Sequence, residues 1–243
     1  MLYFKKIGNA EHGATMKESG NGINAVILDF NGTMVFDSHI HRAVWRDFIP
    51  EHGGGEIDMS DIDRRILGRD NTHILHDFFG DISDEETERL AYEKEAEYRR
   101  RCMLKPEDFH FVNGVEEFLN YLTEKNIPHT IATGSDRYNV DFYFDYFKLG
   151  KWFDRDKVVL DDGSFPGKPD PEVYLRAAEL IGADPADCLV LEDSHSGVTS
   201  ARRAGIGRVI AVVSDTKDKD YYASAGGVDR IVRDFSDWKT FLS

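Results

Sequence analysis

Four short polar clusters contain the residues whose types and spacing could do chemistry. Carboxylates bind hard divalent cations such as Mg²⁺, while hydroxyl groups, backbone amides and a lysine bind phosphoryl oxygens. Together such groups can hold a metal ion and a phosphoryl group, although each cluster alone is a weak signal. The clusters are Asp29-Phe30-Asn31-Gly32-Thr33, Thr133-Gly134-Ser135, Gly167-Lys168-Pro169 and Glu192-Asp193-Ser194.

Each cluster follows a predicted strand, directly or after a short loop. Ala25–Asp29 is a short apolar run that ends in a carboxylate, which is typical of a buried parallel strand. Further strands are predicted at His129–Thr133, Val158–Leu160, Leu189–Glu192, Val209–Val213 and Ile231–Val232, and helices at Val115–Lys125, Arg137–Phe147, Pro171–Ile181, Ser196–Ala204 and Phe235–Leu242. This alternation predicts an α/β fold with a doubly wound parallel sheet, in which ligands bind beyond the carboxyl ends of the strands.

A block of helices interrupts the alternation after the first strand. Its predicted members are His39–Phe48, Met59–Leu67, Asn71–Phe79 and Asp84–Cys102. We interpret residues 37–105 as an inserted helical cap, and residues 25–36 with 106–243 as the core domain. Residues 1–24 read as a loose leader, with a short strand at Leu2–Ile7.

The composition excludes several classes of partner. The 243 residues are 41% hydrophobic and have a formal net charge of −15, which argues against nucleic acid and anionic membranes as partners. No apolar run approaches the ~18 residues of a membrane span, and no signal-peptide pattern begins the chain. Cys102 and Cys188 fall in a predicted helix and a predicted buried strand, so we do not expect a disulfide between them. This fits a reducing environment, and we expect a cytoplasmic location. Nothing in the pattern indicates an oligomeric state.

The four clusters, taken in this order, resemble the motifs of the haloacid dehalogenase (HAD) superfamily. Its first motif is Asp-x-Asp-Gly-Thr, which Asp29–Thr33 matches except at Asn31. The second motif is a strand that ends in Ser or Thr, which Thr130–Ser135 resembles. The third is a Lys before Pro, as in Gly167–Pro171, and the fourth is a strand with paired acids, as in Val190–Ser194. The resemblance covers about residues 25–213, and the helical insertion resembles the cap of the β-phosphoglucomutase and sugar-phosphatase branch.

This resemblance implies roles for individual residues. Asp29 would be the nucleophile that forms an aspartyl-phosphate, and Thr133, Gly134, Ser135 and Lys168 would bind the phosphoryl group. Asp29, the backbone carbonyl of Asn31 and Asp193, with Glu192 close by, would hold Mg²⁺. Arg69 and Asn71 fall where that branch places a loop of the cap that faces the substrate.

Asn31 departs from the family motif. In the family, the second Asp of the first motif acts as the general acid and base, which a carboxamide cannot do. The backbone carbonyl of Asn31 can still bind metal, so metal and phosphate binding are expected to survive. Without the acid, turnover of alkyl phosphates is expected to be slow, whereas acyl or anhydride phosphates, whose leaving groups need no proton, can still be cleaved. Three interpretations of Asn31 stay open. It is natural, with a substrate or another residue removing the need for the acid; it is natural in a protein that binds phosphorylated ligands without efficient turnover; or it is an engineered change that traps a complex.

Related phosphonoacetaldehyde hydrolases also lack the second Asp and use a lysine of the cap to form a Schiff base. Lys94 and Lys105 are the lysines of the predicted cap, and neither is predicted to lie in the apolar setting that such a lysine needs. We therefore do not favour this chemistry.

The sequence thus predicts a Mg²⁺-dependent HAD-type phosphohydrolase that acts on a small phosphorylated metabolite, such as a sugar phosphate. The alternatives are a phosphosugar mutase like β-phosphoglucomutase and a catalytically weak protein that binds phosphorylated ligands.

Overall fold

A five-stranded parallel sheet forms the centre of the molecule. The computed structural model describes residues 22–58, 65–66, 70–213 and 219–243. The strands are β1 (Ala25–Leu28), β2 (His129–Ile131), β3 (Cys188–Glu192), β4 (Arg208–Val212) and β5 (Arg230–Val232), in the order β2-β1-β3-β4-β5. Leu28 of β1 lies opposite Ile131 of β2 and Leu191 of β3, so the carboxyl ends of these three strands are neighbours. The predicted α/β fold with a doubly wound parallel sheet is confirmed.

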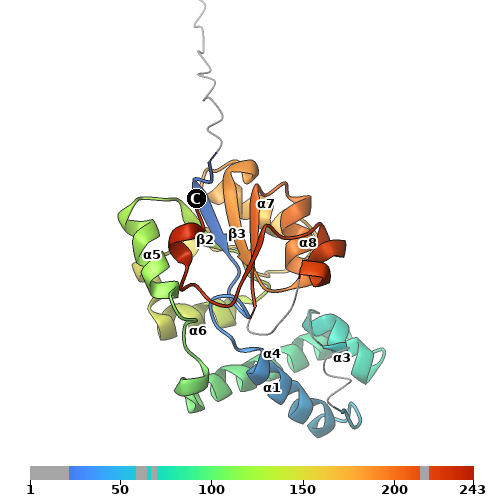
Figure 1. Ribbon diagram of the computed structural model, residues 1–243. Helices are drawn as coiled ribbons and strands as arrows, with labels where there is room; N and C mark the ends of the chain where they lie inside the picture. The colour runs from blue at the N-terminus through green and yellow to red at the C-terminus, as the bar shows by residue number, and fades with distance from the viewer. Residues whose placement is uncertain (1–21, 59–64, 67–69, 214–218) are drawn as a thin grey trace, which may run out of the picture.

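Two apolar layers cover the sheet, one on each face. Side chains of a strand alternate between its faces, so Val26 and Leu28 pack with α5 (Val115–Glu124) and α6 (Arg137–Phe147). Ala25 and Ile27 pack on the other side with α7 (Glu172–Leu180) and α8 (His195–Arg203). Figure 1 shows these two pairs of helices on opposite sides of the sheet.

A separate group of helices lies between β1 and α5 in the chain. It comprises α1 (Ser38–Glu51), α3 (Asn71–Phe79) and α4 (Asp84–Leu104), and Figure 1 shows it at the end of the core where β1 leads out. The group has its own apolar cluster, made of Trp45, Phe48, Ile49, Ile66, Ile74, Leu75 and Leu90. We call this group the cap helices; the domain limits at 36/37 and 105/106 stay a prediction.

Two predicted elements are much shorter than expected. The Val158–Leu160 strand is reduced to a single bridge between Ala132 and Val159, because the amide of Val158 turns back to Arg155. The terminal helix at Phe235–Leu242 is only a 3-10 turn, Trp238–Thr240. Its anchors, Phe235 and Phe241, are fully buried beside Phe118, so aromatic packing rather than helical hydrogen bonding holds this tail.

Other predictions fall wholly or partly outside the described residues. The strand at Leu2–Ile7 lies outside them, as does most of the helix at Met59–Leu67. In the described part of the chain, no helix is both long and apolar enough to cross a membrane.

Candidate active site

Asp29 stands at the carboxyl end of β1, where the strand leaves the sheet. Its backbone amide donates to the carbonyl of Leu191, which continues the pairing of β1 with β3 up to this residue. The residue is 6% exposed, and Thr33 Oγ1 donates to its Oδ2 at 3.1 Å. The pKa of Asp29 is raised to about 7, because burial and the neighbouring Glu192 raise it by more than Lys168 lowers it. Asp29 is therefore a nearly buried carboxylate that an additional positive charge would stabilise.

Lys168 joins the first and last polar clusters. Its Nζ donates to Asp29 Oδ1 at 2.6 Å and to Glu192 Oε1 at 2.7 Å. Burial alone would lower the pKa of this ammonium group, but the two carboxylates raise it well above the usual range. Lys168 thus stays positively charged beside Asp29, where an anionic group would approach.

Glu192 and Asp193 lie at the end of β3, next to β1. Glu192 is 1% exposed, and its Oε2 accepts from the backbone amide of Ser194 at 2.5 Å. A Cβ on Gly197 would stand 1.7 Å from Glu192 Oε1, so the first turn of α8 requires glycine there. Ser194, and not Asp193, accepts the capping hydrogen bond of α8.

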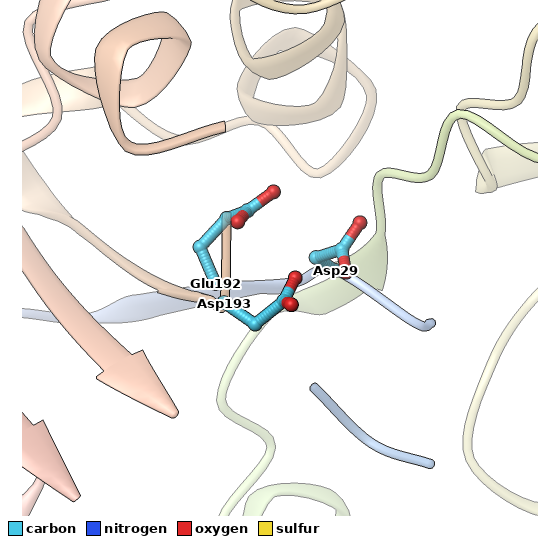
Figure 2. Close-up of side chains that lie close together, drawn as sticks. All are labelled: Asp29, Glu192 and Asp193. Carbon is cyan, nitrogen blue, oxygen red and sulfur yellow. The ribbon is translucent and has the colours of Figure 1, made fainter. Parts of the chain in front are cut away.

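Three carboxylates converge beyond the strand ends. Figure 2 shows Asp29, Glu192 and Asp193 close together, and one ligand atom from each lies within 4.8 Å of the others. Gly32, at φ +78°, passes so close to Asp193 that a Cβ there would meet its Oδ2 at 2.5 Å. Hard oxygen donors in this number suit Mg²⁺. The donor set and the raised pKa of Asp29 together fit a divalent cation.

The cluster after β2 lies on the other side of β1. Thr133 is 2% exposed, and its Oγ1 accepts from the amide of Ser135 at 3.1 Å. Lys168 Nζ lies 3.4 Å from the carbonyl of Ala132, which places the lysine beside this turn. A Cβ on Gly134 would meet no atom within 4 Å among the described residues. Residues from all four predicted clusters therefore surround one small region.

Asn31 is bound on both sides of its amide. Its Nδ2 donates to Asp37 Oδ2 at 2.6 Å and to the hydroxyl of Tyr143 at 2.9 Å, while its Oδ1 accepts from Ser135 Oγ at 2.7 Å. Ser135 therefore contacts Asn31 as well as the turn after β2. An ionised carboxylate can only accept, so the contact with Asp37 fixes which way the amide points.

Asp37 is the main site residue that the sequence reasoning missed. It occupies the cap position before α1 but makes no side-chain capping hydrogen bond. Its carboxylate is fully buried and accepts from Asn31, from the amide of Gly32 at 3.2 Å and from the hydroxyl of Tyr98 at 2.5 Å. Burial raises the pKa of Asp37, but His41, Tyr98 and Asn31 lower it below its usual value. An Asp before a helix looks like an ordinary cap, so no signal in the sequence separated it from one.

Lys94 is buried, although its strongly charged sequence neighbours gave no sign of it, and its surroundings are polar rather than purely apolar. Lys94 is 2% exposed, lies over the ring of Trp45 at 4.9 Å, and pairs with Glu95 at 2.7 Å. Its Nζ is also 3.2 Å from His41 Nδ1. The helical spacing of α4 turns this lysine inward from a strongly charged segment, which a scan of local composition does not reveal. Lys105 is exposed, as expected.

Of the two predicted cap residues, one can be placed. Asn71 Nδ2 donates to Glu95 Oε1 at 2.8 Å, while Glu95 Oε2 accepts from Asn139 of α6 at 2.7 Å. Asn71 thus lies in a polar contact between the cap helices and the core. Arg69 lies outside the described residues.

The fold and the site together define a Rossmann-like α/β core with an ammonium group and three carboxylates that could hold a cation at one sheet edge. Residues 23–205 match the family model described as haloacid dehalogenase-like hydrolase, and the chain belongs to this family.

Similar proteins agree with this assignment. The phosphorylated carbohydrates phosphatase of Thermotoga maritima is 29% identical over 85% of this chain and 93% of its own length. The β-phosphoglucomutase of Bacillus subtilis is 26% identical over 76% and 81%. A crystal structure of a HAD hydrolase of family IA, variant 3, from Entamoeba histolytica covers 88% of this chain and 94% of its own, with a TM-score of 0.80 and 33% identity.

Proposed function

We propose that this protein is a Mg²⁺-dependent phosphohydrolase that acts on a small phosphorylated metabolite through an aspartyl-phosphate on Asp29. The single observation that carries the proposal is the meeting of Asp29 with Lys168, Glu192 and Asp193 at one sheet edge. Similarity to a phosphatase of phosphorylated carbohydrates supports a metabolite of that kind. Two buried, unpaired cysteines support a cytoplasmic location.

Each residue has a definite task in this proposal. Asp29 attacks the phosphorus atom, and Lys168 holds a positive charge next to the transferring group. The Thr133 hydroxyl and the Gly134 amide donate hydrogen bonds to phosphoryl oxygens, and the Ser135 amide joins them by exchanging its bond to Thr133 while its hydroxyl stays on Asn31. Asp29, Asp193, the Asn31 carbonyl and Glu192 would hold Mg²⁺, which supplies charge neutralisation when bound.

A second candidate, a phosphosugar mutase, is favoured by the similarity to β-phosphoglucomutase. A mutase passes the phosphoryl group from the aspartate to a second sugar hydroxyl, so a hexose bisphosphate would form. Release of inorganic phosphate alone would exclude it. Tight binding of sugar phosphates without any turnover would instead favour the third candidate, a binding protein.

The proposal is tested by a screen of small phosphate esters and anhydrides with and without Mg²⁺. We expect inorganic phosphate release that needs the metal and that is lost in Asp29→Asn. Asp145→Asn is the matched control, because Asp145 is exposed on α6. If the folded protein releases no phosphate from any compound, or if Asp29→Asn is as active as the parent chain, the proposal is wrong.

A further inference from the structure

The amide of Asn31 is a built part of the site. Both of its ends are engaged: the nitrogen by Asp37 and Tyr143, and the oxygen by Ser135. Because Asp37 is fully buried and accepts at 2.6 Å, the partner at position 31 must be a donor. A carboxylate at position 31 would place two negative charges in direct contact. The surroundings of position 31 therefore suit an amide.

The titratable groups around Asn31 are occupied within the same network. Tyr98 is fully buried and donates to Asp37, and Tyr143 is 1% exposed. His41 has Nδ1 3.2 Å from the ammonium of Lys94 and Nε2 3.6 Å from Asp37. Among the described residues of this network, each of these groups contacts at least one other side chain of the network.

This arrangement restricts which leaving groups the site can expel. An alkoxide leaving from a phosphate ester must be protonated, and general acid catalysis of that kind contributes ~10²–10⁴-fold. A carboxylate leaves without a proton at neutral pH, since carboxyl groups have pKa values of about 4. Resting on the proposed function, we propose that the substrate is an acyl phosphate, the mixed anhydride of phosphate and a carboxylic acid.

The first step balances without a proton. An oxygen of Asp29 bonds to phosphorus, while the bond from phosphorus to the carboxyl oxygen breaks and its electron pair leaves with the carboxylate. The products are the free carboxylate and the aspartyl-phosphate. Lys168, 2.6 Å from Asp29 in the resting site, is placed to stay beside the transferring group.

The second step is slower, because Asn31 cannot deprotonate water. The water oxygen bonds to phosphorus, the electron pair of the broken bond returns to Asp29, and one water proton moves to a phosphoryl oxygen, giving dihydrogen phosphate. Since the first step needs no acid and the second lacks a base, the aspartyl-phosphate accumulates during turnover.

The test compares acetyl phosphate with glucose 6-phosphate, both with Mg²⁺, and divides each rate by that of Asp29→Asn. We expect kcat/KM at least ~10²-fold higher for acetyl phosphate, the scale of one general acid. Rapid quenching should show a burst of about one acetate per protein and the matching phosphoprotein. In Asn31→Asp/Asp37→Asn, which exchanges the acid and the amide, the glucose 6-phosphate rate should rise ~10²-fold and the burst should disappear.

Outcomes separate this inference from the proposed function. Equal normalised rates for the two substrates in the parent chain would overturn the acyl phosphate inference and leave the phosphohydrolase intact. No turnover and no phosphoprotein with either substrate would overturn both. If the double variant does not fold, aryl phosphates serve with the parent chain: a steep fall of rate with leaving-group basicity is expected, and a flat dependence overturns the inference.

Discussion

At the scale of single residues, Asn31 and Asp37 act as a matched pair. The family motif leads one to see Asn31 as a lost acid, whereas the structure shows its amide as the donor that a buried carboxylate requires. Removing one partner of such a buried pair leaves the other unsatisfied, which costs about 1–3 kcal/mol. The identity of residue 31 therefore affects the stability of the site as well as its chemistry.

We predict that Asn31→Asp alone destabilises the protein by about 1–3 kcal/mol at pH 7.5, because a second carboxylate would lie in contact with the buried Asp37. Sharing a proton raises the folded pKa of the pair above its unfolded value. The penalty is therefore small at low pH and grows as the pH rises through that raised pKa. Urea unfolding at pH 5 and pH 7.5 measures it.

The double variant Asn31→Asp/Asp37→Asn is the control, since it restores one donor and one acceptor. It should recover most of the lost stability at pH 7.5. An Asn31→Asp protein as stable as the parent chain at pH 7.5 would contradict the paired arrangement.

At the scale of elements, α4 is joined to α6 by buried polar contacts. Glu95 of α4 accepts from the Asn139 amide of α6, and Arg99 of α4 donates to the oxygen of that amide at 2.7 Å. Tyr98 and Tyr143 bring the two helices together next to Asn31. These contacts join the cap helices to α6, the core helix that also carries Tyr143, a hydrogen-bond partner of Asn31.

We predict that Glu95 contributes to stability at neutral pH and that this contribution is lost in acid. Burial raises the pKa of Glu95, but Lys94, His41 and Asn71 lower it from 4.5 to about 2. A group whose pKa is lowered by folding stabilises the protein at pH values above its pKa in the unfolded chain. For Glu95 this stabilisation is about 3 kcal/mol, and it is lost as the pH falls from 4.5 towards 2.

Glu95→Gln should therefore lower the free energy of unfolding at pH 7 and flatten its dependence on pH between 5 and 2. Glu93→Gln is the matched control on the same helix, because Glu93 is 40% exposed and pairs with Arg89 on the surface. If the free energy of unfolding falls equally between pH 5 and pH 2 in the parent chain and in Glu95→Gln, the buried Glu95 is not ionised.

At the scale of the whole molecule, a strongly acidic chain gathers three carboxylates at its site. The net charge of −15 opposes an anionic substrate, while Lys168 supplies one positive charge next to Asp29. A bound divalent cation would relieve the repulsion among Asp29, Glu192 and Asp193, so folding and metal binding should be coupled.

We predict that Mg²⁺ at one hundred times its dissociation constant stabilises the protein by about 2.7 kcal/mol, seen as a rise in Tm. KCl at the same ionic strength corrects for screening. Asp193→Asn should remove most of the rise, and Asp145→Asn should keep it. A Tm that does not respond to Mg²⁺ in the parent chain would rule out a metal site of this strength.

The sequence by itself determined the parallel sheet, most of its strands and the four polar clusters, while the order of the strands in the sheet came from the structure. It could do so because apolar runs, turn residues and strand-end polar groups are local patterns, and parallel strands bring their carboxyl ends to one edge. It overstated Val158–Leu160 and Phe235–Leu242, where contacts with distant residues set the outcome.

Only the tertiary structure decided what surrounds Asn31. Asp37, Tyr98 and Tyr143 come from a helix start, the cap helices and the core, and no local pattern links them. Likewise, Lys94 became a buried residue only through the packing of α4 against Trp45 and His41. Burial and hydrogen-bond partners depend on contacts between segments far apart in the chain, and these contacts set the protonation and orientation of the groups around the site.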